Sequence, residues 1–181
     1  MKLIALSGSL RKDSINTRIC QLMVEAGQPH SLSVDVATLH GIPLYDGDLE
    51  DAEGIPAAVT ALRERIKASD GLIIMTPEYN AGIPGVLKNG LDWLTRPGDE
   101  MKPTFGARPV ALAGATPGAW GTSLAQSGAL INLRQLGVHL YPGYLRLSQA
   151  DKALDDAQSR AELFKQLERF LSGFAGFIRG D

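Results

Sequence analysis

Residues 1–26 read MKLIALSGSLRKDSINTRICQLMVEA, and this stretch has the order of a βα unit. The segment from Leu3 to Leu6 is apolar without interruption, which is typical of a strand buried on both faces of a sheet. A loop rich in glycine and hydroxyl side chains follows. An amphipathic stretch from Thr17 to Ala26 then predicts a helix. The first 26 residues therefore predict an α/β fold.

The same alternation continues along the whole chain. Strands are predicted at Leu3 to Leu6, Leu32 to Ala37, Gly71 to Met75, Val110 to Ala113 and Val138 to Tyr141. Helices are predicted at Thr17 to Ala26, Ala57 to Ala68, Pro84 to Leu94, Ser123 to Leu136 and Asp155 to Ile178. Leu163, Leu167, Phe170, Leu171, Phe174 and Ile178 form one apolar stripe on the last helix. This order predicts a parallel sheet covered on both faces, with long loops at Leu39 to Pro56 and Arg96 to Pro109.

Composition excludes several classes of protein. The chain has 181 residues, 44% of them hydrophobic and 21% charged, which fits one globular domain over residues 1–181. A formal net charge of -2 without a basic stripe argues against nucleic acid as a partner. Because the sequence shows one cysteine, no leader pattern and no apolar run of membrane-spanning length, we expect a cytoplasmic location and no membrane partner.

The loop after the first strand has the chemistry of a phosphate site. At the carboxyl ends of parallel strands, helix N-termini present free N–H groups to ligands. Gly8 allows a tight turn, Arg11 offers a guanidinium fork, and the other polar donors are Ser9, Ser14, Asn16 and Thr17. Neither the P-loop pattern nor the dinucleotide pattern G-x-G-x-x-G is present. An ordinary polar loop, with Ser14 or Asn16 capping the helix, remains the alternative interpretation.

The loop after the third strand is stiffened by proline and glycine. Residues 76–93 read TPEYNAGIPGVLKNGLDW, in which Pro84 suits the first turn of a helix. A rigid loop at a strand end can present backbone groups to the edge of a planar heterocycle. A proline and glycine turn without a ligand is the alternative.

Together the two stretches resemble the NADPH-dependent FMN reductase family, which includes bacterial quinone, chromate and azo-dye reductases. The matching strings are GSLRKDSIN at 8–16 and TPEYNAGIPGVLKNGLDW at 76–93. The resemblance runs nearly from end to end and includes Gly114 to Gly118. It implies a flavodoxin-like three-layer sandwich, with a five-stranded parallel sheet in the order 2-1-3-4-5.

The resemblance also implies a non-covalent FMN site. Ser9, Arg11, Ser14, Asn16 and Thr17 would bind the phosphate, with Ile15 in the same set. Pro77, Glu78, Tyr79 and Asn80 would line the isoalloxazine ring, and Thr116 with Gly118 would close its other side. NADPH or NADH would donate a hydride through the flavin to a small acceptor such as a quinone, in a ping-pong sequence. Because flavin carries this chemistry, no catalytic side chain is expected.

Other features favour less specific interpretations. The acidic loop at 46–53 lacks the Gly and Glu that an EF-hand requires, the three histidines have no metal-ligand spacing, and Cys20 suits a small buried core position. A flavodoxin-type electron carrier, or an FMN-binding partner protein with little turnover, remains the alternative function. Such carriers are usually strongly acidic, so the small net charge argues against the first.

The family resemblance and surplus apolar side chains predict a homodimer or homotetramer. The side chains on which this expectation rests are Val86, Leu87, Leu91, Leu94, Leu124, Ile131 and Leu133.

Overall fold

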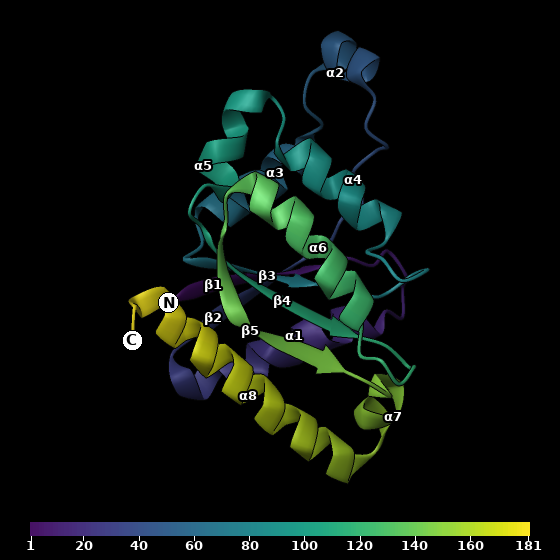
Figure 1. The fold of residues 1–181 in the computed structure, drawn as a ribbon, viewed down its shortest axis with the longest axis vertical. Coiled ribbons are helices and arrows are strands. Elements are labelled where there is room, and N and C mark those ends of the chain that lie inside the picture. Colours follow the sequence, from purple (N-terminus) through teal and green to yellow (C-terminus); the bar gives the residue numbers. More distant parts are fainter.

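A computed structural model describes residues 1–181, and its centre is a five-stranded parallel sheet in the order β2-β1-β3-β4-β5 (Figure 1). The strands are β1 (Lys2–Ser7), β2 (Ser33–Ala37), β3 (Gly71–Met75), β4 (Pro109–Ala115) and β5 (His139–Leu147). The helices are α1 (Ile15–Gly27), α2 (Gly47–Glu53), α3 (Ala57–Lys67), α4 (Gly85–Leu94), α5 (Met101–Phe105), α6 (Ser123–Leu136), α7 (Ala150–Asp155) and α8 (Ala157–Arg179), with short 3₁₀ turns at Gln28–His30 and Gly98–Glu100. The predicted fold and strand order are confirmed.

The sheet is buried on both faces because its strands alternate between two cores. In β1, Leu3 and Ala5 belong to the core under α1 and α8, whereas Ile4 and Leu6 belong to the core under α3, α4 and α6. The central strands β3 and β4 divide their side chains in the same way. This division explains why the strand sequences are apolar at every position rather than at every second one.

Helix α8 covers the sheet with its predicted apolar stripe. Leu163, Leu167, Phe170, Leu171 and Phe174 are buried, and Ile178 packs against the same core. The helix begins after Asp156, whose carboxylate accepts a hydrogen bond of 2.8 Å from the Ser159 N–H. This cap lowers the pKa of the Asp156 carboxyl. The expected start at Asp155 was early, because residues up to Asp155 form the separate helix α7.

The two long loops contain short helices that the periodicity did not reveal. Helix α2 lies in the first loop and stands out from the body of the protein (Figure 1). Its acidic side chains are mostly exposed, and Glu50 pairs with Arg96 at 2.8 Å. The hydrogen bond from Arg96 lowers the pKa of the Glu50 carboxyl. Helix α5 lies in the second loop.

Strand β5 is longer than expected and continues through Pro142 and Gly143 to Leu147. It lies at the edge of the sheet, where a proline removes no hydrogen bond that a neighbour needs. Its register with β4 shifts between Val110 and Leu112, beside the proline. Strand β5 can therefore continue through Pro142 because it lies at the edge of the sheet, and the local sequence does not indicate that position.

No helix combines the length and the apolarity needed to cross a bilayer. Cys20 lies on α1 and is fully buried. Burial raises the pKa of its thiol to about 12. The prediction of a small buried core residue is confirmed.

The packing of Gly114 near the end of β4 gives a test of the fold. A Cβ at this position would collide with the Thr122 hydroxyl and the Thr76 carbonyl oxygen. Because the second neighbour is backbone, we expect Gly114→Ala to lower the free energy of unfolding by about 1–3 kcal/mol in urea titrations. The matched control is Gly128→Ala, at an exposed position of α6 where a Cβ would meet open space. The control should stabilise the protein by about 0.5–1 kcal/mol. Equal stability of the two variants would contradict the packing at Gly114.

Candidate functional site

A cavity of about 200 Å³ lies where the loops after β1, β3 and β4 meet. These strands are parallel neighbours, so their carboxyl ends lie at the same edge of the sheet. Such an edge is the usual position of a ligand site in open α/β sheets. Cavities of about 280 and 400 Å³ occur elsewhere beside α8, but neither contains a residue of the two sequence motifs.

Nine of the twelve predicted cofactor-binding residues line this cavity. They are Ser9, Arg11, Ser14, Ile15, Asn16, Pro77, Glu78, Tyr79 and Thr116. Thr17, Asn80 and Gly118 do not line it, whereas Ala115 and Pro117 do. These two lack side-chain donors, so only their position beside Thr116 could have indicated them.

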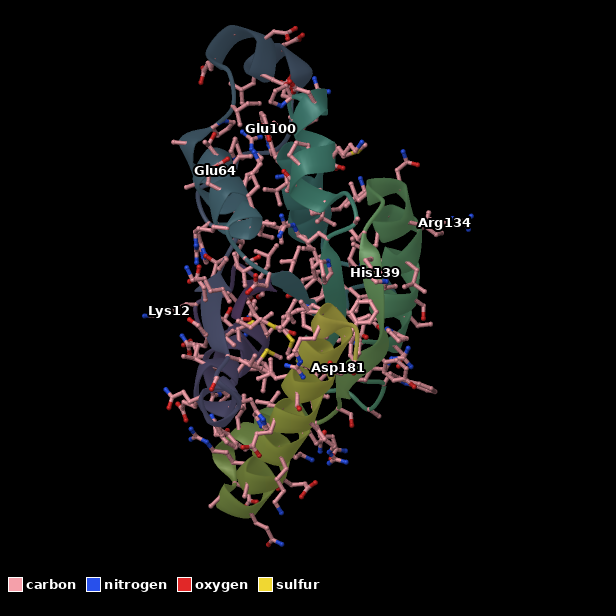
Figure 2. The ribbon with its side chains drawn as sticks, turned by 90° about the vertical axis from the view of Figure 1, so that its left-hand side faces the viewer. Lys12, Glu64, Glu100, Arg134, His139 and Asp181 are labelled. Atoms are coloured by element: carbon pink, nitrogen blue, oxygen red, sulfur yellow. The ribbon has the colours of Figure 1, made fainter.

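The N-terminus of α1 opens onto the cavity. Ser14 is its N-cap, and its Oγ accepts a hydrogen bond of 3.2 Å from the Thr17 N–H. Ser14 therefore has the capping role that the alternative interpretation gave to Ser14 or Asn16, and its hydroxyl hydrogen stays available to a ligand. The first N–H groups of a helix have no acceptor within it, so this helix end suits an anion. Arg11 is exposed at the rim, while Lys12 points away from the protein (Figure 2).

Asn16 joins α1 to β4. Its Nδ2 donates to the Ala115 carbonyl at 2.9 Å, and its Oδ1 accepts from the Ala115 N–H at 3.0 Å. The side chain is only 3% exposed, and its remaining amide hydrogen is its one free donor. Thr17 is turned toward β1, where its hydroxyl lies 2.8 Å from that of Ser7. This contact explains why Thr17 is absent from the cavity wall.

The loop after β3 closes on itself in a tight turn. Tyr79 and Gly82 exchange two backbone hydrogen bonds of 3.0 Å. The two residues between them, Asn80 and Ala81, have φ values of 50° and 61°, as a type I′ turn requires. The turn places Asn80 at an exposed tip, outside the cavity, and leaves Tyr79 in the cavity wall.

Glu78 connects this loop to the loop after β4. Its Oε2 accepts hydrogen bonds of 2.9 Å from the N–H groups of Leu124 and Ala125, in the first turn of α6. In the loop after β4, the Thr116 Oγ1 accepts from the Gly118 N–H at 3.2 Å. Gly118 therefore shapes the loop behind Thr116 rather than the cavity surface.

His40 is a further contact that the sequence did not indicate. Its Nε2 lies 3.2 Å from the Leu10 carbonyl oxygen, and its Nδ1 lies 3.1 Å from the Thr38 hydroxyl. A carbonyl oxygen can only accept, so Nε2 carries the hydrogen of this bond. His40 thereby holds the backbone of the loop that contains Arg11 from a segment 30 residues away.

Known proteins of one family are similar to this chain over most of its length. The family described as NADPH-dependent FMN reductase matches residues 1–152. An NAD(P)H-dependent FMN reductase of Pseudomonas aeruginosa is 40% identical over 187 residues, covering 99% of this chain and 98% of that protein. A 2-hydroxy-1,4-benzoquinone reductase of a Burkholderia species is 34% identical over 188 residues, covering 99% and 97%.

A solved structure of a flavoenzyme has the same fold. The flavoenzyme NAD(P)H:(acceptor) oxidoreductase of Paracoccus denitrificans superposes with a TM-score of 0.73 at 28% identity, over 96% of this chain and 97% of that one. Fold, motifs and full-length similarity lead to one conclusion: this chain belongs to the NADPH-dependent FMN reductase family.

Proposed function

We propose that the chain reduces quinones and related small electrophiles with NAD(P)H, by means of non-covalently bound FMN. One observation carries the proposal. The open N-terminus of α1, with Arg11 beside it, shares a cavity with the rigid loop at Pro77 to Tyr79. A phosphate donor set and a surface for a planar ring thus lie within the span of one ligand.

The residues of the cavity fit FMN in two parts. Ser9, Arg11 and Ser14, with the first N–H groups of α1, provide donors for a phosphate. Pro77, Tyr79 and Thr116 provide the surface for the ring. Ile15, Asn16 and Glu78 complete the wall, and Thr17, Asn80 and Gly118 shape the loops from outside it. When bound, FMN supplies the transfer of reducing equivalents from the nicotinamide to the acceptor.

The small size of the cavity supports sequential use of one open face. Ligand pockets usually have volumes of about 300–1,000 Å³, so a cavity of about 200 Å³ encloses only part of FMN. The remaining surface of the flavin would then be open to a nicotinamide and afterwards to an acceptor in the same place, and this order would give ping-pong kinetics. Quinones are the first acceptors to test, followed by chromate, azo and nitro compounds.

A homodimer or homotetramer is the proposed assembly, and its apolar surface agrees only in part with the one expected. Leu87, Leu91, Leu94 and Leu133 are buried in the core of the chain itself. Ile131, which belongs to the expected set, is 79% exposed, whereas Leu44 and Trp120, exposed by 81% and 79%, were not expected. On α6, Leu124 and Leu130 lie near Ile131 in sequence and are also exposed. The exposed apolar side chains of α6 support a self-association surface on this helix.

The small net charge of -2 supports small molecules rather than nucleic acid as partners. We further propose a cytoplasmic location, where NAD(P)H is supplied.

The cofactor and the reaction can be tested together. The purified protein should be yellow, release FMN on denaturation, and oxidise NAD(P)H with a quinone and no partner protein. Initial rates at several quinone concentrations should give parallel double-reciprocal lines. Release of FAD would contradict the single-phosphate site, intersecting lines would contradict the ping-pong order, and absence of turnover would favour an electron carrier or partner protein.

Arg11→Ala should weaken FMN binding. Loss of a charge-assisted hydrogen bond costs about 1.5–3 kcal/mol, or roughly ten- to a hundredfold in Kd. Fluorescence titration of the apoprotein measures the change. The matched control is Lys12→Ala, because Lys12 is a neighbouring exposed cation outside the cavity. Equal affinities for the two variants would show that Arg11 does not contact the phosphate.

Assembly can be tested at α6. Light scattering should give a mass of at least twice the 19.3 kDa of the chain. Ile131→Asp should reduce the mass by placing a charge in the apolar contact. Lys165→Asp, at an exposed position of α8, should leave the mass unchanged. A wild-type mass of 19.3 kDa with full quinone reductase activity would refute the proposed assembly.

A further inference from the structure

Helix α6 begins without a cap from its own sequence. Thr122 occupies the N-cap position in the left-handed region, with φ of 62°, and its side chain accepts no backbone N–H of the first turn. The Ser123 N–H donates to the Trp120 carbonyl, and the Gln126 N–H donates to the Thr122 carbonyl. The N–H groups of Leu124 and Ala125 lie between these two and need acceptors from elsewhere.

The carboxylate of Glu78 satisfies both groups with one oxygen. Glu78 precedes these residues by 46 and 47 positions and belongs to a different loop. A carboxylate at a helix N-terminus is stabilised by the helix dipole as well as by the hydrogen bonds, and α6 has 14 residues. The contact is therefore a helix cap that joins two distant segments.

The loop after β3 forms one wall of the cavity, and the loop after β4, which leads into α6, forms another. Pro77, Glu78 and Tyr79 line it from the loop after β3, and Thr116 and Pro117 line it from the loop after β4. At the base of the walls, the Thr76 N–H donates to the Ala113 carbonyl at 2.8 Å and continues the sheet. Farther along, the contact of Glu78 ties the loop after β3 to the first turn of α6, where the loop after β4 ends.

We propose that Glu78 is a positioning residue, which sets the spacing of the two flavin-binding loops by capping α6. This inference rests on the proposed function, because the spacing of the two loops matters for binding only if they hold FMN.

Hydrogen exchange of the Leu124 and Ala125 amides tests the cap in the absence of any cofactor. In the apoprotein, Glu78→Ala should raise exchange at Leu124 and Ala125 by roughly tenfold or more, because a hydrogen bond to a charged group is lost at each. Glu78→Gln keeps a neutral acceptor and should recover much of the protection. The matched control is Glu25→Ala, which removes an exposed carboxylate from α1, far from the cavity wall. Unchanged exchange in Glu78→Ala would overturn the capping role.

Binding and kinetics separate positioning from proton transfer. We expect Glu78→Ala to weaken FMN binding by roughly ten- to a hundredfold, and Glu78→Gln to restore most of the affinity and keep the wild-type pH profile of kcat. If Glu78→Gln loses kcat as fully as Glu78→Ala while binding FMN normally, the carboxyl transfers a proton and the inference is wrong. If the wild-type protein binds no FMN, the proposed function fails, and the exchange result still decides the role of Glu78 in the fold.

Discussion

The parallel pairing of β1 with β3, and of β3 with β4, is the constraint on which the site depends. Each of these strands is buried on both faces, so its register is held by two cores at once. The pairing brings Ser7 opposite Met75, and Met75 opposite Ala113, which aligns the points at which the three loops leave the sheet. A shift of one residue in any strand would exchange its core faces and separate these loops.

The N-termini of α1 and α6 lie at this edge, and the free N–H groups of their first turns find acceptors in different ways. The first turn of α1 has only the Ser14 hydroxyl as a cap, which leaves room for an external anion. The first turn of α6 is occupied by the carboxylate of Glu78. Because negative charge is favourable at both ends, the internal carboxylate on α6 leaves the N-terminus of α1 as the end proposed for a phosphate. The polarity of the proposed cofactor, with phosphate at α1 and ring beside the loop after β3, follows from this difference.

The walls of the cavity are connected by contacts between side chain and backbone rather than by long-range ion pairs. Asn16 bonds both backbone groups of Ala115, His40 bonds the backbone of Leu10, and Glu78 bonds the backbone of α6. Such bonds fix the position of a loop without adding bulk inside the cavity. They are consistent with a protein that orients a cofactor and leaves the redox chemistry to it.

The sequence by itself determined the five strands and the five longest helices, and largely through the family resemblance it also gave the strand order and nine of the residues in the cavity wall. It could do so because buried parallel strands are apolar throughout and helix stripes recur every three to four residues, both of which are local signals. Tertiary structure alone decided the partners of Asn16 and Glu78, which lie 99 and 46 residues away in the chain. It also decided that Leu87 and Leu91 face the core, that Ile131 faces outward, and that β5 tolerates Pro142. No local pattern carries these facts, because each depends on which distant segment lies alongside, and the packing of the sheet and its helices settles that.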